Sequence, residues 1–440
     1  METDTFLTRC DYLRNKKLGA ECVMTKGIYE LVSKEQVQKY AELAVRVGVN
    51  VQKSQLVVIH SDIKNATFAR FIQTVAYEAG ASNVFIDWTD EQSTKEFYLN
   101  AADSAIDHFP DWHAARFKEW DEAGATYIHI ISENLEVFKE VSKERINRFQ
   151  KASRTKLKDY HAKIRSHEIR WCLLAVPSVE WATKVFPKLS KEEALRSLWE
   201  LILKGCRADG KDPIKDWETH NRAFESRKKI LNESQFESLH FTNRRGTDLS
   251  VGLPKNHLYI GGGVIDKKGT PFFPNIPTEE IFTAPHKYKV NGKLVGTKPL
   301  IYGGSVIDEF YLIFKDGRIT DYYAAKGQEL LQNLIETDEG SHYLGEIALV
   351  SNKSPLSQAD TLFFNTLFDE NTSCHIGIGN ASPSNIQKGI EQSEEELKAS
   401  GLNTSLLLVN VTFGTEDMKV VGIKEGEKEV LLMKDGDFQF

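Results

Sequence analysis

A strand–helix–strand pattern in the first half of the chain restricts its fold more than any other feature. Residues 56–59 and 84–86 are short apolar runs, and between them apolar residues recur at helical spacing over 68–79. Strands that are apolar throughout are typical of a parallel sheet covered on both faces, and the length of the connection suits a right-handed crossover. Further apolar runs at 127–131 and 171–176 extend the same predicted sheet.

The pattern changes near residue 239, after which turn signals separate short alternating strands. The segments Arg245-Gly-Thr-Asp248, Asn291-Gly292 and Asp316-Gly317 each lie between two such runs and predict hairpins. We therefore expect an α/β fold in which a parallel-sheet α/β domain precedes a β-rich α+β domain. The predicted segments are an N-terminal extension at 1–34, the α/β domain at 35–238 and the β-rich domain at 239–440.

Composition and charge exclude several classes of function. The 440-residue chain carries 56 basic and 63 acidic side chains, and its net charge of −7 gives no general attraction to nucleic acid or anionic lipid. No run reaches the roughly 18 apolar residues of a membrane-spanning helix. The five cysteines form neither a disulfide framework nor a CxxC pair, and residues 1–6 do not resemble a signal peptide. We expect a cytoplasmic protein that binds neither nucleic acid nor membranes.

A basic segment at 143–170 is the one local feature that could bind nucleic acid, but a charged helix exterior is the commoner cause of such a run. The segments Gly261-Gly-Gly263 and Gly303-Gly304 do not join a strand to a helix, so we interpret them as tight turns rather than phosphate loops. The sequence contains no GxGxxG, GxxxxGK[ST], GxSxG or HExxH motif. The common dinucleotide, nucleoside triphosphate, α/β-hydrolase and zincin sites are therefore excluded.

Three residues of the β-rich half lie where a carboxylate or an imidazole would need a partner. Glu280 follows Pro277, whose fixed φ angle stiffens the backbone. Glu346 lies within the apolar run 344–350, and His375 lies beside apolar and glycine residues. An unpaired charge is expensive to bury, so these residues either bind a metal ion or form hydrogen bonds as structural side chains. Spacing alone leaves both interpretations open.

At these positions the sequence resembles the aminopeptidase T family of dinuclear metallopeptidases. The resemblance extends from about Lys39 to the C-terminus. It rests on Gly246-Thr-Asp-Leu249, Val251-Gly-Leu253, Pro277-Thr-Glu-Glu280, Leu344-Gly-Glu346, Asn365-Thr-Leu-Phe-Asp-Glu-Asn371 and Cys374-His375, among other segments. It implies an α/β N-terminal domain, a C-terminal domain that holds two metal ions, a homodimer, and removal of N-terminal residues from peptides.

The resemblance also implies which residues bind metal. The family has two glutamates, a histidine and a final His-x-Asp pair, and Glu280, Glu346 and His375 match the first three. In the segment 401–415, Leu408 stands at the histidine position and Asn410 at the aspartate position. Ser382 replaces a tyrosine that the family has seven residues beyond the first histidine. Leucine has no lone pair and asparagine has no negative charge, so two bound ions are disfavoured.

We therefore expect at most one divalent ion (zinc, cobalt, manganese or iron), and a site without metal is the other interpretation. The first hypothesis is a metallohydrolase that acts on N-terminal amino acids or peptide-like amides, with Glu280 and Glu346 as catalytic residues. The alternatives are a repurposed protein that binds or modifies a peptide or amino-acid conjugate, with Cys374 as a nucleophile, and a binding module without activity. The candidate substrate-pocket residues are Asn275, His286, Cys374 and Ser382.

Overall fold

The computed structural model describes residues 31–132, 134, 136–302, 305–426 and 428–440. Most of the predicted extension at 1–34 and the predicted turn at 303–304 lie outside the described residues. A parallel sheet forms the centre of the first half, as predicted, and it has five strands. Its strand order is β2-β1-β3-β4-β9. The strands are β1 (Leu56–Asp62), β2 (Asn83–Thr89), β3 (Thr126–Ile131), β4 (Trp171–Ala175) and β9 (Asn275–Ile276).

Strand β9 comes from the second half of the sequence and pairs in parallel with β4, so the two halves share this sheet. The first half also contains helices, and a capping box formed by Ser190 and Glu193 begins α11. They are α3 (Lys34–Glu42), α4 (Ala66–Glu78), α5 (Glu91–Asn100), α6 (Asp103–Ile106), α7 (Asp111–Glu122), α8 (Lys143–Lys156), α9 (Lys158–Arg165), α10 (Val179–Val185), α11 (Lys191–Gly205) and α12 (Pro213–Ser234). Short helical turns are η1 (Leu43–Gly48) and η2 (Ile63–Asn65).

A large antiparallel sheet forms one layer of the β-rich half. Its order is β12-β13-β11-β6-β5-β18-β19-β20, and β14 pairs with β13. The strands are β5 (Ser238–Thr242), β6 (Asp248–Gly252), β11 (Val290–Val295), β12 (Leu300–Tyr302), β13 (Ser305–Lys315), β14 (Arg318–Lys326), β18 (Lys419–Lys424), β19 (Lys428–Lys434) and β20 (Asp437–Phe438).

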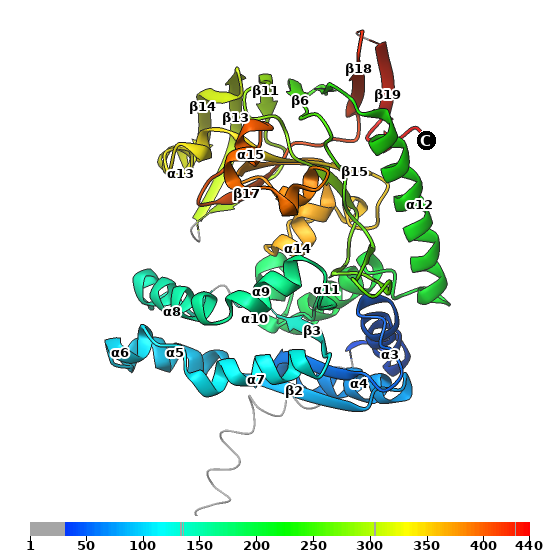
Figure 1. Ribbon diagram of the computed structural model, residues 1–440, viewed down its shortest axis with the longest axis vertical. Coiled ribbons are helices and arrows are strands. Elements are labelled where there is room, and N and C mark those ends of the chain that lie inside the picture. The colour runs from blue at the N-terminus through cyan, green and yellow to red at the C-terminus, as the bar shows by residue number, and fades with distance from the viewer. Residues whose placement is uncertain (1–30, 133, 135, 303–304, 427) are drawn as a thin grey trace, which may run out of the picture.

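A four-stranded antiparallel sheet forms the second layer, in the order β10-β15-β16-β17. Its strands are β10 (Glu280–Thr283), β15 (Leu344–Val350), β16 (His375–Gly379) and β17 (Leu408–Thr412), and a separate hairpin consists of β7 (Val264–Ile265) and β8 (Pro271–Phe272). The remaining helices are α13 (Gln328–Ile335), α14 (Thr366–Asp369), α15 (Glu394–Ala399) and the short turns η3 (Gly340–His342), η4 (Ser357–Ala359), η5 (Glu370–Thr372), η6 (Pro383–Asn385) and η7 (Gly389–Glu391). Figure 1 shows the β-rich half above helices α8–α11, with α12 running alongside.

The hairpins predicted around Arg245-Gly-Thr-Asp248 and Asp316-Gly317 are confirmed as β5–β6 and β13–β14. The hairpin predicted at Asn291-Gly292 is wrong, because both residues lie inside β11. A Cβ atom at Gly292 would lie 2.2 Å from the backbone oxygen of Asp248. The glycine therefore permits close approach of the neighbouring strand rather than a turn.

The two antiparallel sheets pack face to face, and this packing decides which side of the smaller sheet is free for chemistry. Its core-facing residues are Ile281, Ile347, Leu349, Ile376, Ile378 and Val411, which are buried in one cluster with Phe241 and Leu249 of the large sheet. Successive side chains of a strand alternate between faces. Glu280, Glu346, His375 and Asn410 therefore project from the opposite face. None of the described helices has the length and apolarity needed to span a membrane.

Candidate metal centre

The smaller sheet brings the three predicted ligands together from three neighbouring strands. Glu280 opens β10 and pairs with Val350 of β15, while Ala348 of β15 pairs with His375 of β16. Glu346 is two residues before Ala348, so its side chain is on the same face as that of His375. Glu280 and Glu346 are 66 positions apart in the sequence, and Glu346 and His375 are 29 positions apart. Strand pairing brings all three together.

The distances among the three side chains fit a shared divalent cation. His375 Nε2 lies 3.2 Å from Glu280 Oε2 and 3.3 Å from Glu346 Oε1. One potential ligand atom from each residue lies within 4.8 Å of the others. The His375 side chain is fully buried, and the two carboxylates are each 12% exposed. Two carboxylates and an imidazole in this arrangement can hold one zinc or similar ion and leave coordination positions for water and substrate.

The other nitrogen of the His375 ring is held by the backbone. His375 Nδ1 lies 3.2 Å from the carbonyl oxygen of Ser373, to which it donates when protonated. This contact orients the ring so that Nε2 faces the two carboxylates, as the outer contact of a metal-binding histidine does. Burial lowers the pKa of His375, but hydrogen bonds and charge from Glu280 and Glu346 outweigh burial and raise its pKa well above the ordinary value.

Glu280 is held in place by a buried amide from the segment just before β16. Asn371, which is 1% exposed, accepts hydrogen bonds at its Oδ1 from the backbone N–H groups of Glu279, at 2.5 Å, and Glu280, at 3.2 Å. Its Nδ2 donates to the carbonyl oxygen of Leu367 at 2.9 Å. The amide therefore fixes the start of β10 relative to β16, which carries the histidine.

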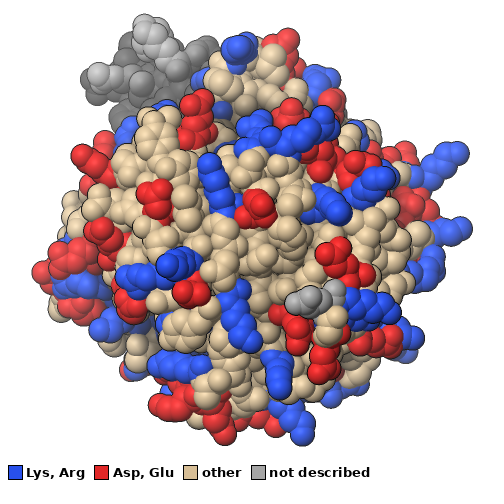
Figure 2. Space-filling view, turned by 90° about the horizontal axis from the view of Figure 1, so that it is seen from above, with Lys and Arg blue, Asp and Glu red and all other residues tan. Residues whose placement is uncertain are grey.

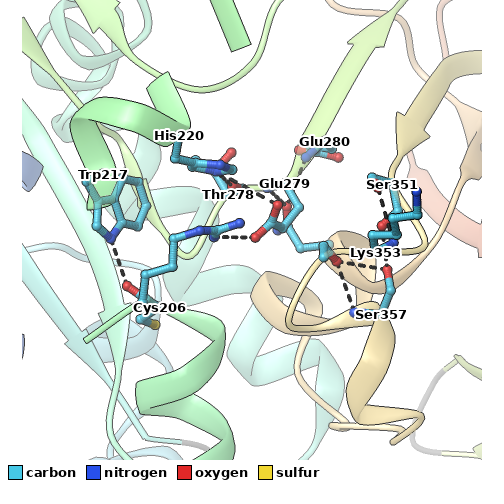
Figure 3. A network of polar contacts seen from close by, with 12 residues as sticks. Cys206, Trp217, His220, Thr278, Glu279, Glu280, Ser351, Lys353 and Ser357 are labelled. Atoms are coloured by element: carbon cyan, nitrogen blue, oxygen red, sulfur yellow. Dashed lines mark hydrogen bonds and ion pairs between the residues drawn. The ribbon is translucent and has the colours of Figure 1, made fainter. Parts of the chain in front are cut away.

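The side chain of Glu279 points away from Glu280 and connects the site to the helical part of the molecule (Figure 3). It forms an ion pair with Arg207, which lies just after α11. His220 of α12 contacts the carbonyl oxygen of Thr278 at 2.8 Å, and burial lowers the pKa of His220 to about 3. A neutral His220 therefore donates to this carbonyl, and α11 and α12 anchor the segment that leads into Glu280.

Replacing Asn371 with alanine tests this anchoring. We expect Asn371→Ala to lower the free energy of unfolding by about 2 kcal/mol and to weaken metal binding about 10-fold, because the Glu279 and Glu280 amides lose their buried partner. Asn403→Ala is the matched control, since the buried Asn403 amide donates to Gly340 and Gly379 and does not contact Glu280. Equal metal affinity in the two variants, measured by competition with a chelator, would contradict a positioning role.

The two positions that should complete a second metal site lie on the same face, in β17. Asn410 pairs with Gly377 and Leu408 pairs with Gly379. A Cβ atom at Gly377 would lie 2.5 Å from Leu408 Cδ1, 2.9 Å from Glu346 Cβ and 3.1 Å from Asn410 Oδ1. Leu408 and Asn410 are therefore neighbours of Glu346 over a glycine that leaves them room. Asn410 Oδ1 is buried and has no hydrogen-bond partner among the described residues.

Glu370 is a functional candidate that the sequence analysis missed. It lies in η5, and its carboxylate accepts a hydrogen bond from Asn410 Nδ2 at 3.4 Å. Burial raises the pKa of Glu370 well above the ordinary value, and the charges of Glu280 and Glu346 raise it further. Burial also raises the pKa of Glu280, with His375 opposing and Glu346 adding to the shift. Three acidic groups that destabilise one another when ionised are suited to a cation.

Comparison with known proteins identifies the family. Residues 33–438 match the family described as thermophilic metalloprotease (M29). The chain belongs to the M29 family. It is 42% identical over 406 residues to Aminopeptidase AmpS of Bacillus subtilis (strain 168), and the match covers 92% of this chain and 99% of that protein. It is 36% identical over 403 residues to Aminopeptidase T of Thermus thermophilus, with 92% and 98% covered.

The structure of wild-type AmpT from Thermus thermophilus matches this M29 chain with a TM-score of 0.84 at 35% identity. The match covers 92% of this chain and 100% of that one. The predicted family resemblance is therefore confirmed, and so is the predicted fold class, a parallel-sheet α/β region with a β-rich antiparallel region. Membership of a metalloprotease family implies use of a divalent metal, which agrees with the grouping of Glu280, Glu346 and His375.

Cys374 lies beside His375 in the sequence but on the core side of the sheet. It is 2% exposed and packs in the cluster between the two antiparallel sheets. Its Sγ donates to the carbonyl oxygen of Val350 at 3.5 Å, and burial raises its pKa to about 11. A thiol that is protonated at neutral pH and faces away from the carboxylates is poorly placed for nucleophilic attack.

Replacing Cys374 with serine separates the two catalytic hypotheses. We expect Cys374→Ser to retain activity within about 3-fold of the unchanged protein, because the thiol only packs in the core, while stability falls by about 1 kcal/mol. A loss of more than about 100-fold with a correctly folded variant would favour the nucleophile. Turnover of an aminoacyl p-nitroanilide and a thermal unfolding curve measure both quantities.

The other three predicted pocket residues lie in different surroundings. Asn275 is in β9 and pairs with Leu173 of the parallel sheet. The His286 ring packs against Gly401, where a Cβ atom would lie 2.6 Å from it. Ser382 precedes η6, and its side chain accepts from the N–H of Ser384. Contact of these three residues with substrate stays a prediction.

Proposed function

We propose that this protein is a metal-dependent aminopeptidase whose site binds a single divalent cation through Glu280, Glu346 and His375. The observation that carries the proposal is the meeting of these three side chains, with potential ligand atoms within 4.8 Å of one another. They meet on the face of the smaller sheet that does not pack against the large sheet. Family membership supports it, as do relatives that are named aminopeptidases. The substrate would be a peptide or an amino-acid amide with a free N-terminus.

The number of cations follows from the chemistry of Leu408 and Asn410. Two divalent ions a few ångströms apart repel strongly, and anionic ligands between them offset that repulsion. Leu408 supplies no donor atom, and Asn410 supplies a neutral oxygen. Glu370 adds one buried carboxylate, but without an imidazole beside it the second position lacks the donors that a transition metal prefers.

The residues of the chain have separable roles in hydrolysis. A bound divalent cation would supply Lewis-acid activation of the scissile carbonyl and of the attacking water. Whichever of Glu280 and Glu346 keeps a carboxylate oxygen uncoordinated accepts the proton of that water and delivers it to the leaving amine. His375 is held by Ser373, so its Nε2 stays directed at the carboxylates throughout.

Hydrolysis of a panel of aminoacyl p-nitroanilides tests the proposed function. We expect turnover that chelation abolishes and that a divalent metal restores. Turnover that a chelator does not change, or no turnover by protein that has been loaded with zinc, cobalt, manganese or iron in turn, would contradict the proposal.

Metal affinity should rise with pH. The pKa values of both Glu280 and His375 are raised when no ion is bound, so protons compete with the cation for these groups. We expect binding at about pH 8 to be at least 10-fold tighter than at about pH 6, because binding must displace these protons. A titration of zinc against a competing indicator at each pH measures the difference, and a flat response would contradict it.

A further inference from the structure

A partly buried lysine lies at the edge of the smaller sheet, outside the group of candidate metal ligands. Strand β17 is the last strand of that sheet, and the backbone N–H of Thr297 donates to the carbonyl oxygen of Thr412 in β17 at 3.0 Å. Thr412 in turn pairs with His375 of β16. Lys298 follows Thr297, so its backbone is two strand spacings, or roughly 10 Å, from the strand that carries the histidine.

The ammonium group of Lys298 lies on the ligand side of the sheet. Its Nζ donates to the carbonyl oxygen of Thr361 at 3.3 Å. Thr361 belongs to the segment that continues through α14 into η5, where the Glu370 carboxylate accepts from Asn410 Nδ2 on the ligand face. The lysine side chain therefore reaches from the edge of β17 to the segment that contacts the ligand face.

Lys298 has no counter-ion within the part of the chain that the structure describes. Its three N–H groups make one hydrogen bond there, to a neutral carbonyl, and no carboxylate forms an ion pair with it. The Asp369 carboxylate already accepts from the backbone N–H groups of Phe363 at 2.7 Å and Asn365 at 3.0 Å. Burial lowers the pKa of Lys298, and the charges of Asp369 and Asp360 only partly oppose that effect. A partly desolvated cation without a counter-ion is suited to an anionic ligand.

We propose that Lys298 binds the terminal carboxylate of a peptide of two or three residues whose N-terminal residue is held at the metal centre. This inference rests on the proposed aminopeptidase function and names its substrate class. An extended chain spans about 3.4 Å per residue, so such a peptide covers about 7 to 10 Å, which the lysine side chain can meet from its place beyond β17. A longer peptide places its carboxylate past the lysine, and a peptide amide has no charge to pair with it. Lys298 is a specificity-determining residue in this view and takes no part in bond breaking.

Matched substrates with and without a terminal carboxylate test the inference. The protein is loaded with metal, and kcat and KM are measured for leucyl-glycyl-glycine, for its C-terminal amide and for leucine p-nitroanilide. We expect KM for the peptide to be about 10- to 100-fold lower than for its amide, with similar kcat values, because a hydrogen bond to a charged group contributes that much.

Three variants assign the preference to one side chain. Lys298→Met should remove the difference in KM and leave hydrolysis of the amide and the p-nitroanilide within about 2-fold, while Lys298→Arg should retain most of the difference. Lys315→Met, at an exposed position at the end of β13, is the matched control and should change nothing. A peptide-to-amide ratio that stays the same in folded Lys298→Met would overturn the inference. A kcat that falls for all three substrates would overturn it too, because the lysine would then act on the oxyanion of the tetrahedral intermediate.

Binding provides a second readout that needs no turnover. Calorimetry uses an analogue of the peptide in which CH2–NH replaces the scissile amide, together with the C-terminal amide of that analogue. The free carboxylate should bind about 10- to 100-fold more tightly, and Lys298→Met should remove the preference. This preference without hydrolysis of any substrate would contradict the proposed function alone. Hydrolysis without the preference would contradict the inference alone, and absence of both would contradict both.

Discussion

The double variant Leu408→His/Asn410→Asp is expected to bind about two equivalents of divalent metal, where the unchanged protein binds about one. Both positions lie on the ligand face of β17, beside Gly377 and Glu346. The new imidazole supplies the missing donor, and the new carboxylate offsets the repulsion between two cations. Asn410 Oδ1, which is buried without a hydrogen-bond partner in the part of the chain that the structure describes, would become one oxygen of that carboxylate.

The single variants separate the two contributions. Asn410→Asp alone adds charge without an imidazole, and we expect it to bind a second ion much more weakly than the double variant does. Leu431→His controls for binding by any exposed histidine, because Leu431 is similarly exposed in the other sheet. Elemental analysis after gel filtration gives the stoichiometry. A double variant that folds and still binds about one equivalent would show that β17 is not the second half of the site.

Replacement of His375 or of Glu346 should be the most damaging single change. We expect Glu346→Gln and His375→Ala each to lower kcat/KM at least about 100-fold and to leave less than about a tenth of the bound metal. Glu346 Oε1 lies 3.3 Å from His375 Nε2, so each residue is also a direct partner of the other. His375→Ala removes the imidazole that both buried carboxylates contact, so the stability of this variant is expected to fall as well.

The measurement for these variants combines metal content with kinetics. Glu233→Gln, at an exposed position near the end of α12, is the control for a carboxylate that lies outside the site. If Glu346→Gln and His375→Ala both keep their bound metal, the ion binds elsewhere in the protein. The face in Figure 2 shows basic and acidic side chains interspersed, so weak binding at surface carboxylates must be removed by a chelator wash before analysis.

The sequence predicted the sheet of the first half because its strands are apolar on both faces and are separated by a helix with clear periodicity. It did not predict β9, whose two residues join that sheet 100 positions after the end of β4, since β4 ends at Ala175 and β9 begins at Asn275. The apolar pattern within a strand does not show which distant strand it pairs with. The turn predicted at Asn291-Gly292 was wrong for the same reason. Glycine permits the close approach of a neighbouring strand as well as a turn, and the local sequence does not distinguish the two.

The three candidate ligands were predicted because Glu280 follows prolines, because Glu346 and His375 lie among apolar residues, and because the surrounding segments resemble a known family. Glu370 and Asn371 were missed although both belong to the quoted segment 365–371. They lie in η5, where no strand alternation indicates which side chain faces the site. Only the tertiary structure shows that Asn371 holds the Glu280 backbone and that Glu370 contacts Asn410. Because successive side chains of a strand alternate between faces, the Cys374 side chain lies on the face opposite that of His375.

The metal content of the purified, unchanged protein tests the central claim most directly. The protein is washed with chelator, saturated with zinc, freed of excess metal and measured by elemental analysis against protein concentration. One cation held by Glu280, Glu346 and His375 predicts about one equivalent per chain, which the His375→Ala variant loses. About two equivalents in the unchanged protein would contradict the claim that Leu408 and Asn410 leave the second position incomplete.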